Sequence, residues 1–209
     1  MRFTFSIKEN KQEIQNKILK ALLPDCKKFM NSAIGVIKTD LPGLLYTSLT
    51  NRPEYFSLIS GNLRLELGIP DASSKVQSII NIWISNIEYD YSKPTISGGK
   101  IISSFSAKFV KTDFSDVISS EEAYVIDGEY NLPWLKWLLL DGSATIVPRH
   151  DVVFGPNPNS RTGDAVMRPS SKGWGVPSDY AGTASDNWIT RAIADSQSDI
   201  EQLLARALS

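Results

Sequence analysis

The 209-residue sequence contains one cysteine, Cys26, and one histidine, His150. A single cysteine excludes an internal disulfide and any cysteine-rich zinc site. A single histidine leaves one candidate base for nucleophilic catalysis, and the sequence has no Gly-x-Ser-x-Gly nucleophile elbow to place beside it. We therefore expect a protein without enzymatic activity, metal or organic cofactor. A hydrolase that uses His150 is the weaker alternative.

Long apolar runs and a large net charge are also missing. No apolar run approaches the roughly 20 residues that span a bilayer, and the N-terminal sequence MRFTFSIKENKQE lacks the apolar core of a signal peptide. The 22 basic side chains balance 23 acidic ones, which gives no global reason to expect nucleic acid or an anionic membrane as a partner. We expect a protein kept in a cytoplasm, or in a particle assembled there, with no membrane partner.

The charges that are present are unevenly distributed along the chain. Residues 1–50 hold eight basic and four acidic side chains, whereas residues 113–129 hold six acids and no base. Such a separation is typical either of complementary faces on neighbouring subunits or of two solvated faces. The sequence leaves both interpretations open.

Helical periodicity dominates the N-terminal part and the C-terminus. Apolar residues at helical spacing predict a helix over residues 8–23, which Pro24 kinks or restarts, and a second helical layer that includes residues 71–87. Residues 131–142 predict a short buried helix that Asn131 caps and Gly142 ends. An amphipathic helix is predicted from a cap at Ser185 to the C-terminus, and its apolar stripe comprises Ile189, Ile193, Ile200, Leu203 and Ala207.

Period-two alternation begins after Asn86 and predicts strands. Residues 87–92 and 99–110 are expected to form a hairpin, and residues 122–127 and 143–156 supply shorter strands. The expected fold is therefore α+β, an antiparallel or mixed sheet packed with helices, in a single domain over residues 1–209. A long N-terminal helix, a C-terminal amphipathic helix and an extended loop or hairpin arm complete it.

The expected arm covers residues 155–184, a stretch rich in Gly, Pro, Ser and Asp that also carries Val166, Met167, Trp174, Val176 and Tyr180. A flexible linker would lack these large apolar side chains, and residues 164–169 and 173–177 can pair as a hairpin. Trp174 either packs back onto its own domain or inserts into a partner's pocket, where tryptophan is a common hot spot. We hypothesise that the arm docks on an adjacent subunit with Trp174 as an anchor.

Four basic residues lie near this arm in the sequence: Arg149, Arg161, Arg168 and Lys172. They would contact phosphates if they lined one surface, although aspartates lie among them and nearly balance their charge. Protein contacts are the simpler use of mixed arginine and aspartate. A role in contacting DNA therefore stays an alternative.

Two stretches resemble a known family: GEYNLPWLKWLLLDGSATIVPRHDVVFGPNPNSRTGDAVM and GWGVPSDYAGTASDNWITRAI. The LPWLKWLLLDG helix, the strand that ends in VVFGP, the SRTG turn and the lead VPSDYAGTASDNWITRA resemble neck and tail-completion proteins of tailed bacteriophages, related to the minor tail-component family of long-tailed phages. The resemblance covers residues 128–194, about a third of the chain. The matching residues are typical of a structural element and suggest no catalytic function.

The resemblance implies an α+β virion protein whose copies form a ring between the capsid portal and the tail tube, contacting adjacent neck, adaptor or tail proteins. The expected location is the virion neck or tail region, where the lumen would bring the subunit close to packaged DNA. Alternatives within this class are a tail terminator and a DNA-contacting or gating component of the head–tail connector. The residues expected at the subunit interface are Arg161, Arg168, Trp174, Tyr180 and Trp188.

Overall fold

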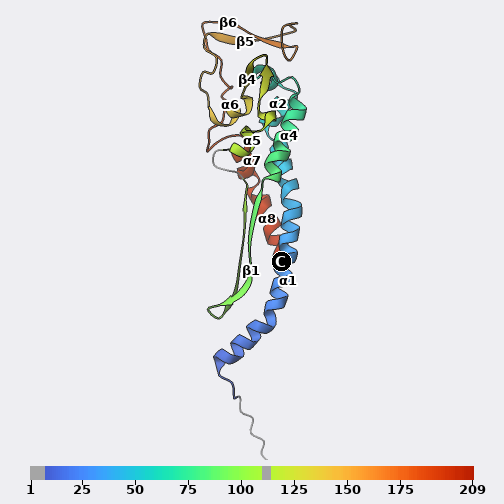
Figure 1. Ribbon diagram of the computed structural model, residues 1–209, viewed down its shortest axis with the longest axis vertical. Helices are drawn as coiled ribbons and strands as arrows, with labels where there is room; N and C mark the ends of the chain where they lie inside the picture. Colours follow the sequence, from blue (N-terminus) through green and yellow to red (C-terminus); the bar gives the residue numbers. More distant parts are fainter. Residues whose placement is uncertain (1–7, 110–113) are drawn as a thin grey trace, which may run out of the picture.

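The computed structural model describes residues 8–109 and 114–209 and confirms the α+β class. Its described helices run along most of the chain (Figure 1). Their bounds are α1 Lys11–Thr50, α2 Pro53–Ile59, α3 Asn62–Glu66, α4 Ala72–Ser85, α5 Ser115–Ile118, the 3-10 turn η1 Glu121–Ala123, α6 Trp134–Leu140, α7 Trp188–Asp195 and α8 Gln197–Ala207.

The described strands form three separate antiparallel hairpins rather than one sheet covered by helices. A two-stranded sheet has no interior strand, so each hairpin depends on helices or loops for its packing. The hairpins are β1 Glu88–Ser97 with β2 Lys100–Lys108, β3 Val125–Asp127 with β4 Tyr130–Leu132, and β5 His150–Phe154 with β6 Ala165–Pro169.

The protein is elongated, with a head at one end and a stalk at the other (Figure 1). We define the stalk as residues 11–36 of α1 together with the β1–β2 hairpin, which lies alongside them. The head contains α2 to α7 and the two shorter hairpins, and β5–β6 lies at the end farthest from the stalk. Helix α8 descends from the head beside α1.

Helix α1 is a single 40-residue helix, so of the two predicted alternatives at Pro24, a kink or a restart, the restart is wrong. Asn10 and Glu13 form a capping box that satisfies backbone N–H groups at its start. Pro24 and Pro42 remain inside the helix, and Figure 1 shows α1 bending in its lower part, as interior proline favours. In its upper half α1 buries one face, made of Ala33, Ile34, Ile37, Leu41, Leu45 and Leu49.

The β1–β2 hairpin covers one face of the lower α1. Gln15 donates from Nε2 to the carbonyl of Gly99 in the hairpin turn at 2.9 Å, and the ammonium of Lys38 lies 5.3 Å from the centre of the Tyr89 ring. Tyr89 also stacks on Phe105 across the two strands. A hairpin between these two stretches is confirmed, but its bounds differ from the prediction. Strand β1 continues to Ser97 through residues expected in the connection, and β2 ends at Lys108. Residue 110 lies outside the described residues.

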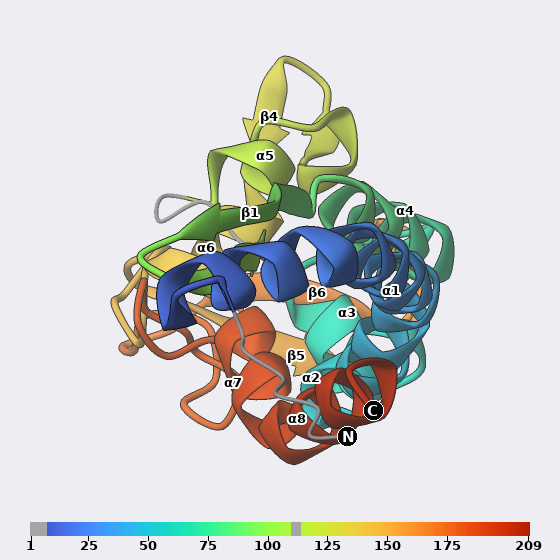
Figure 2. The same ribbon diagram turned by 90° about the horizontal axis from the view of Figure 1, so that it is seen from below.

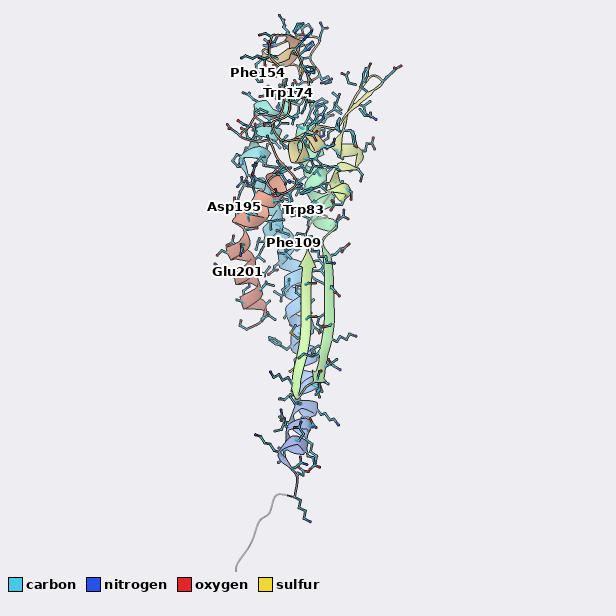
Figure 3. All side chains as sticks on the ribbon, turned by 90° about the vertical axis from the view of Figure 1, so that its left-hand side faces the viewer. Trp83, Phe109, Phe154, Trp174, Asp195 and Glu201 are labelled. Atoms are coloured by element: carbon cyan, nitrogen blue, oxygen red, sulfur yellow. The ribbon has the colours of Figure 1, made fainter. Side chains whose placement is uncertain are left out.

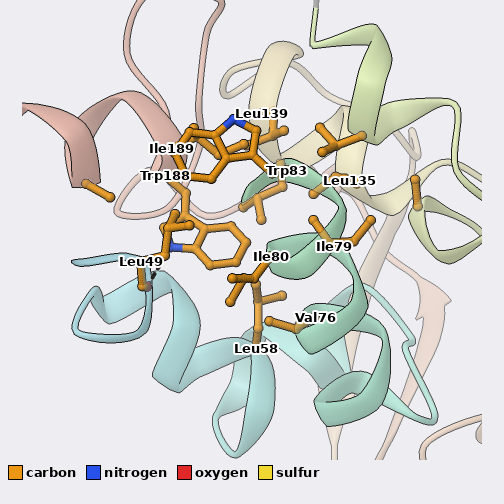
Figure 4. Packing of buried hydrophobic residues seen from close by; sticks show 14 of the residues in the cluster. Leu49, Leu58, Val76, Ile79, Ile80, Trp83, Leu135, Leu139, Trp188 and Ile189 are labelled. Atoms are coloured by element: carbon orange, nitrogen blue, oxygen red, sulfur yellow. Dashed lines mark hydrogen bonds between the residues drawn. The ribbon is translucent and has the colours of Figure 1, made fainter. Parts of the chain in front are cut away.

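Figure 4 shows the centre of the head, where Trp188 packs near Leu49, Ile80 and Trp83. Trp188 is 1% exposed, and its Nε1 donates to the carbonyl of Leu49 at 3.1 Å. Leu49 lies near the C-terminal end of α1, so this contact joins segments 139 residues apart. The core is built from α1, α2, α4, α6 and α7.

A charged cluster ties α7 to α2 beside this core. Glu54 is buried, and its carboxylate pairs with Arg191 at 3.0 Å and with Arg52 at 3.3 Å. Arg191 also donates to Asp186, and this hydrogen bond lowers the pKa of the Asp186 carboxyl. Because the buried carboxylate has two cationic partners, its desolvation is compensated.

Three of the predicted boundaries are wrong. The C-terminal helix is broken at Ser196 into α7 and α8, and its cap is Asn187, which accepts from the backbone of Ile189 and Thr190. Helix α6 begins after Pro133 rather than at a cap on residue 131. Residues 164–169 pair with His150–Phe154, whereas the stretch around Trp174 makes only an isolated bridge to Val147.

Replacing Trp188 by alanine should lower the free energy of unfolding by about 3–5 kcal/mol, because it leaves a large cavity at the junction of α1 and α7. Urea unfolding followed by far-UV circular dichroism measures the change. Phe56→Ala is the control, because Phe56 is 54% exposed, and it should shift the free energy by no more than about 0.5 kcal/mol. Equal losses in the two variants would contradict this account of the core.

Candidate assembly interface

The single histidine has a local role in the structure. His150 is the first residue of β5 and is half-buried. Its Nδ1 lies 3.1 Å from the carbonyl oxygen of Pro148. Within residues 8–109 and 114–209, no group of three or more His, Cys, Asp or Glu side chains could hold a metal. Among the described helices, none has the length and apolarity needed to cross a membrane.

The arm, residues 155–184, folds back along its own head. Trp174 exchanges backbone hydrogen bonds with Val147, with N···O distances of 2.8 and 3.0 Å. Gly173 and Gly175 permit this approach, since a Cβ at either position would collide with Thr145 or with the carbonyl of Ala144. The glycines that flank Trp174 in the sequence are therefore required by close backbone packing.

The indole of Trp174 is 4% exposed within its own chain. Its ring meets Trp137 edge-on with the centroids 6.0 Å apart, and its Nε1 donates to Oε2 of Glu66 at 3.1 Å. Trp188 is likewise buried in the core. The structure corrects the hypothesis that Trp174 is an anchor in a neighbouring subunit. Both predicted interface tryptophans lie inside the head, because their own chain supplies apolar and hydrogen-bonding partners.

The other three predicted interface residues lie nearer the surface. Arg161 is exposed and forms an ion pair with Asp127, which belongs to the acidic stretch of the same chain. Arg168 is exposed and lies opposite Asp151 in the β5–β6 register. Tyr180 is half-buried against the core. The structure does not bring the five predicted residues together at one surface, and the interface role of Arg161, Arg168 and Tyr180 stays a prediction.

The four basic residues near the arm are divided in the same way. Arg149 and Lys172 are exposed near β5–β6, and Arg149 adopts a left-handed backbone with φ of 58°. Arg168 shares this region, whereas Arg161 is directed to Asp127. Three of the four basic residues therefore lie in or next to the β5–β6 hairpin, which is at the end of the head farthest from the stalk (Figure 1).

Glu66 lies beneath the arm, at the edge of a hollow of about 260 Å³ between α3 and the β5–β6 hairpin. Burial raises the pKa of the Glu66 carboxyl, the charge of Asp151 raises it further, and the hydrogen bond from Trp174 opposes the shift. The raised pKa means that the folded protein holds the Glu66 proton more tightly than the unfolded chain does. Glu66 is thus a structural contact of the arm.

Exposed apolar side chains occur in places that sequence reasoning missed, among them Phe154 on the outer hairpin (Figure 3). The lower α1 exposes a stripe that we call the stalk stripe, the β3–β4 hairpin exposes two residues, and the outer hairpin exposes Phe154 and its neighbour. The exposed residues are Ile18, Leu22, Phe29 and Val36 of the stalk stripe, Ile126 and Tyr130 of β3–β4, and Val153 and Phe154 of β5. The seven-residue spacing of Leu22, Phe29 and Val36 was visible in the sequence, but the packing face of an ordinary amphipathic helix has the same spacing.

The geometry defines an elongated α+β protein with separate exposed apolar surfaces, and its described residues contain no group of side chains that could hold a metal. No family model, no curated protein and no solved structure matches the chain. The arrangement of its surfaces therefore carries the functional argument.

Trp174→Ala should lower the free energy of unfolding of the isolated protein by about 3–5 kcal/mol, because the indole is buried in its own head. Thermal and urea unfolding measure the loss. The half-buried Tyr180 provides a comparison, and Tyr180→Ala should cost less. If Trp174→Ala leaves the midpoint unchanged, the indole is not packed in the monomer and the intersubunit anchor is the better account.

Glu66→Gln should stabilise the protein at neutral pH, because glutamine keeps an acceptor for Trp174 and removes a buried charge near Asp151. The folded protein binds the Glu66 proton more tightly than the unfolded chain, whose carboxyl titrates near 4.5. Wild-type stability therefore falls as the pH rises from 4.5 through the folded pKa, and the advantage of the variant appears over that same window.

Melting temperatures of both proteins between pH 4 and pH 8 test this expectation. Glu88→Gln is the matched control, because Glu88 is an exposed carboxylate. A Glu66→Gln advantage that is as large below pH 4.5 as at neutral pH would show that ionisation of Glu66 is not its cause.

Proposed function

We propose that this chain is a structural subunit of a tailed-bacteriophage virion, a ring-forming neck or tail-completion protein that joins the tail to the head. The observation that carries the proposal is the pair of unpartnered apolar surfaces, on the stalk and on β3–β4, at different places on an elongated chain. A subunit of a closed ring needs two different complementary surfaces, one for each neighbour. Its partners are copies of itself and the neck, adaptor or tail proteins above and below.

The stretch that resembles the phage family supports this proposal because it has a structural role. Residues 128–194 include α6, the β5–β6 hairpin, the arm and most of α7. These elements supply Trp134, Trp174 and Trp188 to the core of the head. The resemblance therefore concerns a folded unit of the chain.

A DNA-contacting component of the connector is the second candidate function. It is favoured by the exposed Arg149, Arg168 and Lys172 near one end of the molecule, which would suit phosphates if that end faced the lumen. Asp151 opposite Arg168 reduces the local positive charge. We therefore place this function below the purely structural one, together with a tail-terminator role.

The proposed function predicts that the chain is present in purified virions of the phage that encodes it, in the copy number of a ring. Quantitative mass spectrometry gives the copy number, and electron microscopy with a labelled antibody locates it at the neck. Disrupting the gene should leave filled heads and tails unjoined. Absence of the chain from purified virions would overturn the proposal.

DNA binding separates the two candidates. Weak binding that falls with salt and is lost in a variant with Arg149, Arg168 and Lys172 changed to glutamate would favour the DNA-contacting role. Normal infectivity of the same variant would favour the structural role.

A further inference from the structure

The stalk stripe lacks a partner within the described residues. At 100° per residue, Ile18, Leu22, Phe29 and Val36 fall within an arc of about 40°, and they are 38–54% exposed. Helix α8 reaches only the upper part of α1, where Arg206 in its last turn contacts Asp40 at 2.8 Å. Below that point nothing in the described chain covers this side.

The lower part of α1 is positively charged overall. At about 100° per residue, Lys11 lies in line with the stripe and Lys17 and Lys28 flank it on one side. Lys20 and Lys27 lie on the opposite face of the helix, and Asp25 lies beside the stripe. The segment of α1 from residue 11 to residue 36 carries five lysines against two acids, and all seven side chains are exposed. Its lysines are Lys11, Lys17, Lys20, Lys27 and Lys28, and its acids are Glu13 and Asp25. A surface of this kind is complementary to an acidic, partly apolar partner.

A surface of that description exists on the same chain. The β3–β4 hairpin, residues 125–132, which we call the finger, projects from the head (Figure 2). Gly128 has φ of 61° at the first position of its two-residue loop, as a type II′ turn requires. Ile126 is 66% exposed and Tyr130 73%, which makes them more exposed than any other large apolar residue in the described chain.

The finger and the turn before it are acidic. Residues 121–132 contain four acids and no base, which are Glu121, Glu122, Asp127 and Glu129. Glu122 pairs with Lys75 and Asp127 with Arg161. Glu121 and Glu129 are exposed and form no ion pair with any described residue. These two carboxylates remain for an external cation.

The dimensions of the two surfaces agree. Leu22 and Phe29 are seven residues apart on a helix, which is about 10 Å along the axis. A three-residue strand such as β3 or β4 has a similar length of about 10 Å. One finger therefore fits along two turns of the stalk stripe.

The register places Ile126 and Asn131 on one face of the finger and Asp127 and Tyr130 on the other. We propose that the finger of one copy docks on the stalk stripe of the next copy through the first of these faces, with Ile126 against Leu22 and Phe29. This inference rests on the proposed function, and it identifies the partner of the stalk surface as a second copy of the chain. Lysines of the stalk face Glu121 and Glu129 of the finger. Because the two surfaces differ, the contact is heterologous, and repetition leads head-to-tail from copy to copy.

The test uses the full chain and one variant of each surface. The stalk variant is Leu22→Asp with Phe29→Asp, which removes the apolar contact and repels the acidic finger. The finger variant is Ile126→Lys, which repels the stalk lysines. Ile102→Asp is the matched control, because Ile102 is 51% exposed but belongs to neither surface. Circular dichroism and melting temperature check that each variant is folded.

Sedimentation velocity over a concentration series gives the outcome. Wild type and the Ile102→Asp control should associate into larger species, and high salt should weaken that association. Each surface variant alone should remain a monomer. An equimolar mixture of the two should form a dimer and stop there, because it contains one intact finger and one intact stalk.

Three results would overturn the docking contact: a wild type that stays monomeric at its highest soluble concentration, association that persists in either surface variant, or a mixture that remains monomeric. The virion experiment is separate. If the chain is found in a neck ring and yet associates without these two surfaces, the proposed function stands and this contact fails. If the mixture dimerises but the chain is absent from virions, the reverse holds.

Discussion

The packing of Trp188 against the C-terminal end of α1 is the contact on which the rest of the structure depends. Its indole fills the space between α1, α4 and α7, and its N–H satisfies the carbonyl of Leu49. This places α7 on the core, and α8 then follows back along α1. A segment near the end of the chain thereby closes the core that the N-terminal helices begin.

Because that core is confined to the head, the stalk is stabilised in a different way. Within the described chain its lower helix has the hairpin on one face only, so its stability comes from the capping box, from helical hydrogen bonds that Pro24 interrupts at one position, and from contacts such as Gln15 with Gly99. A long helix with a single covered face exposes apolar surface that a monomer does not need. The shape of the molecule and its unpartnered stripe therefore have one cause.

The arm shows how a sequence can contain the correct residues and still suggest the wrong partner. Val176 and Trp174 do need burial, as their types indicate, and both are buried. Their partners, among them Trp137 and Glu66, come from distant parts of the same chain. Local composition states that burial is required but cannot state which surface supplies it.

The α+β class, the long N-terminal helix and the β1–β2 hairpin followed from the sequence, because periodicity and turn residues act over a few neighbouring positions. Tertiary structure decided the pairing of β6 with β5, the break at Ser196 and the exposure of the stalk stripe. Each of these depends on which distant segments meet. An apolar stripe with seven-residue spacing looks the same in the sequence whether or not another helix covers it. Here α8 ends above the stalk stripe, where its Arg206 contacts Asp40.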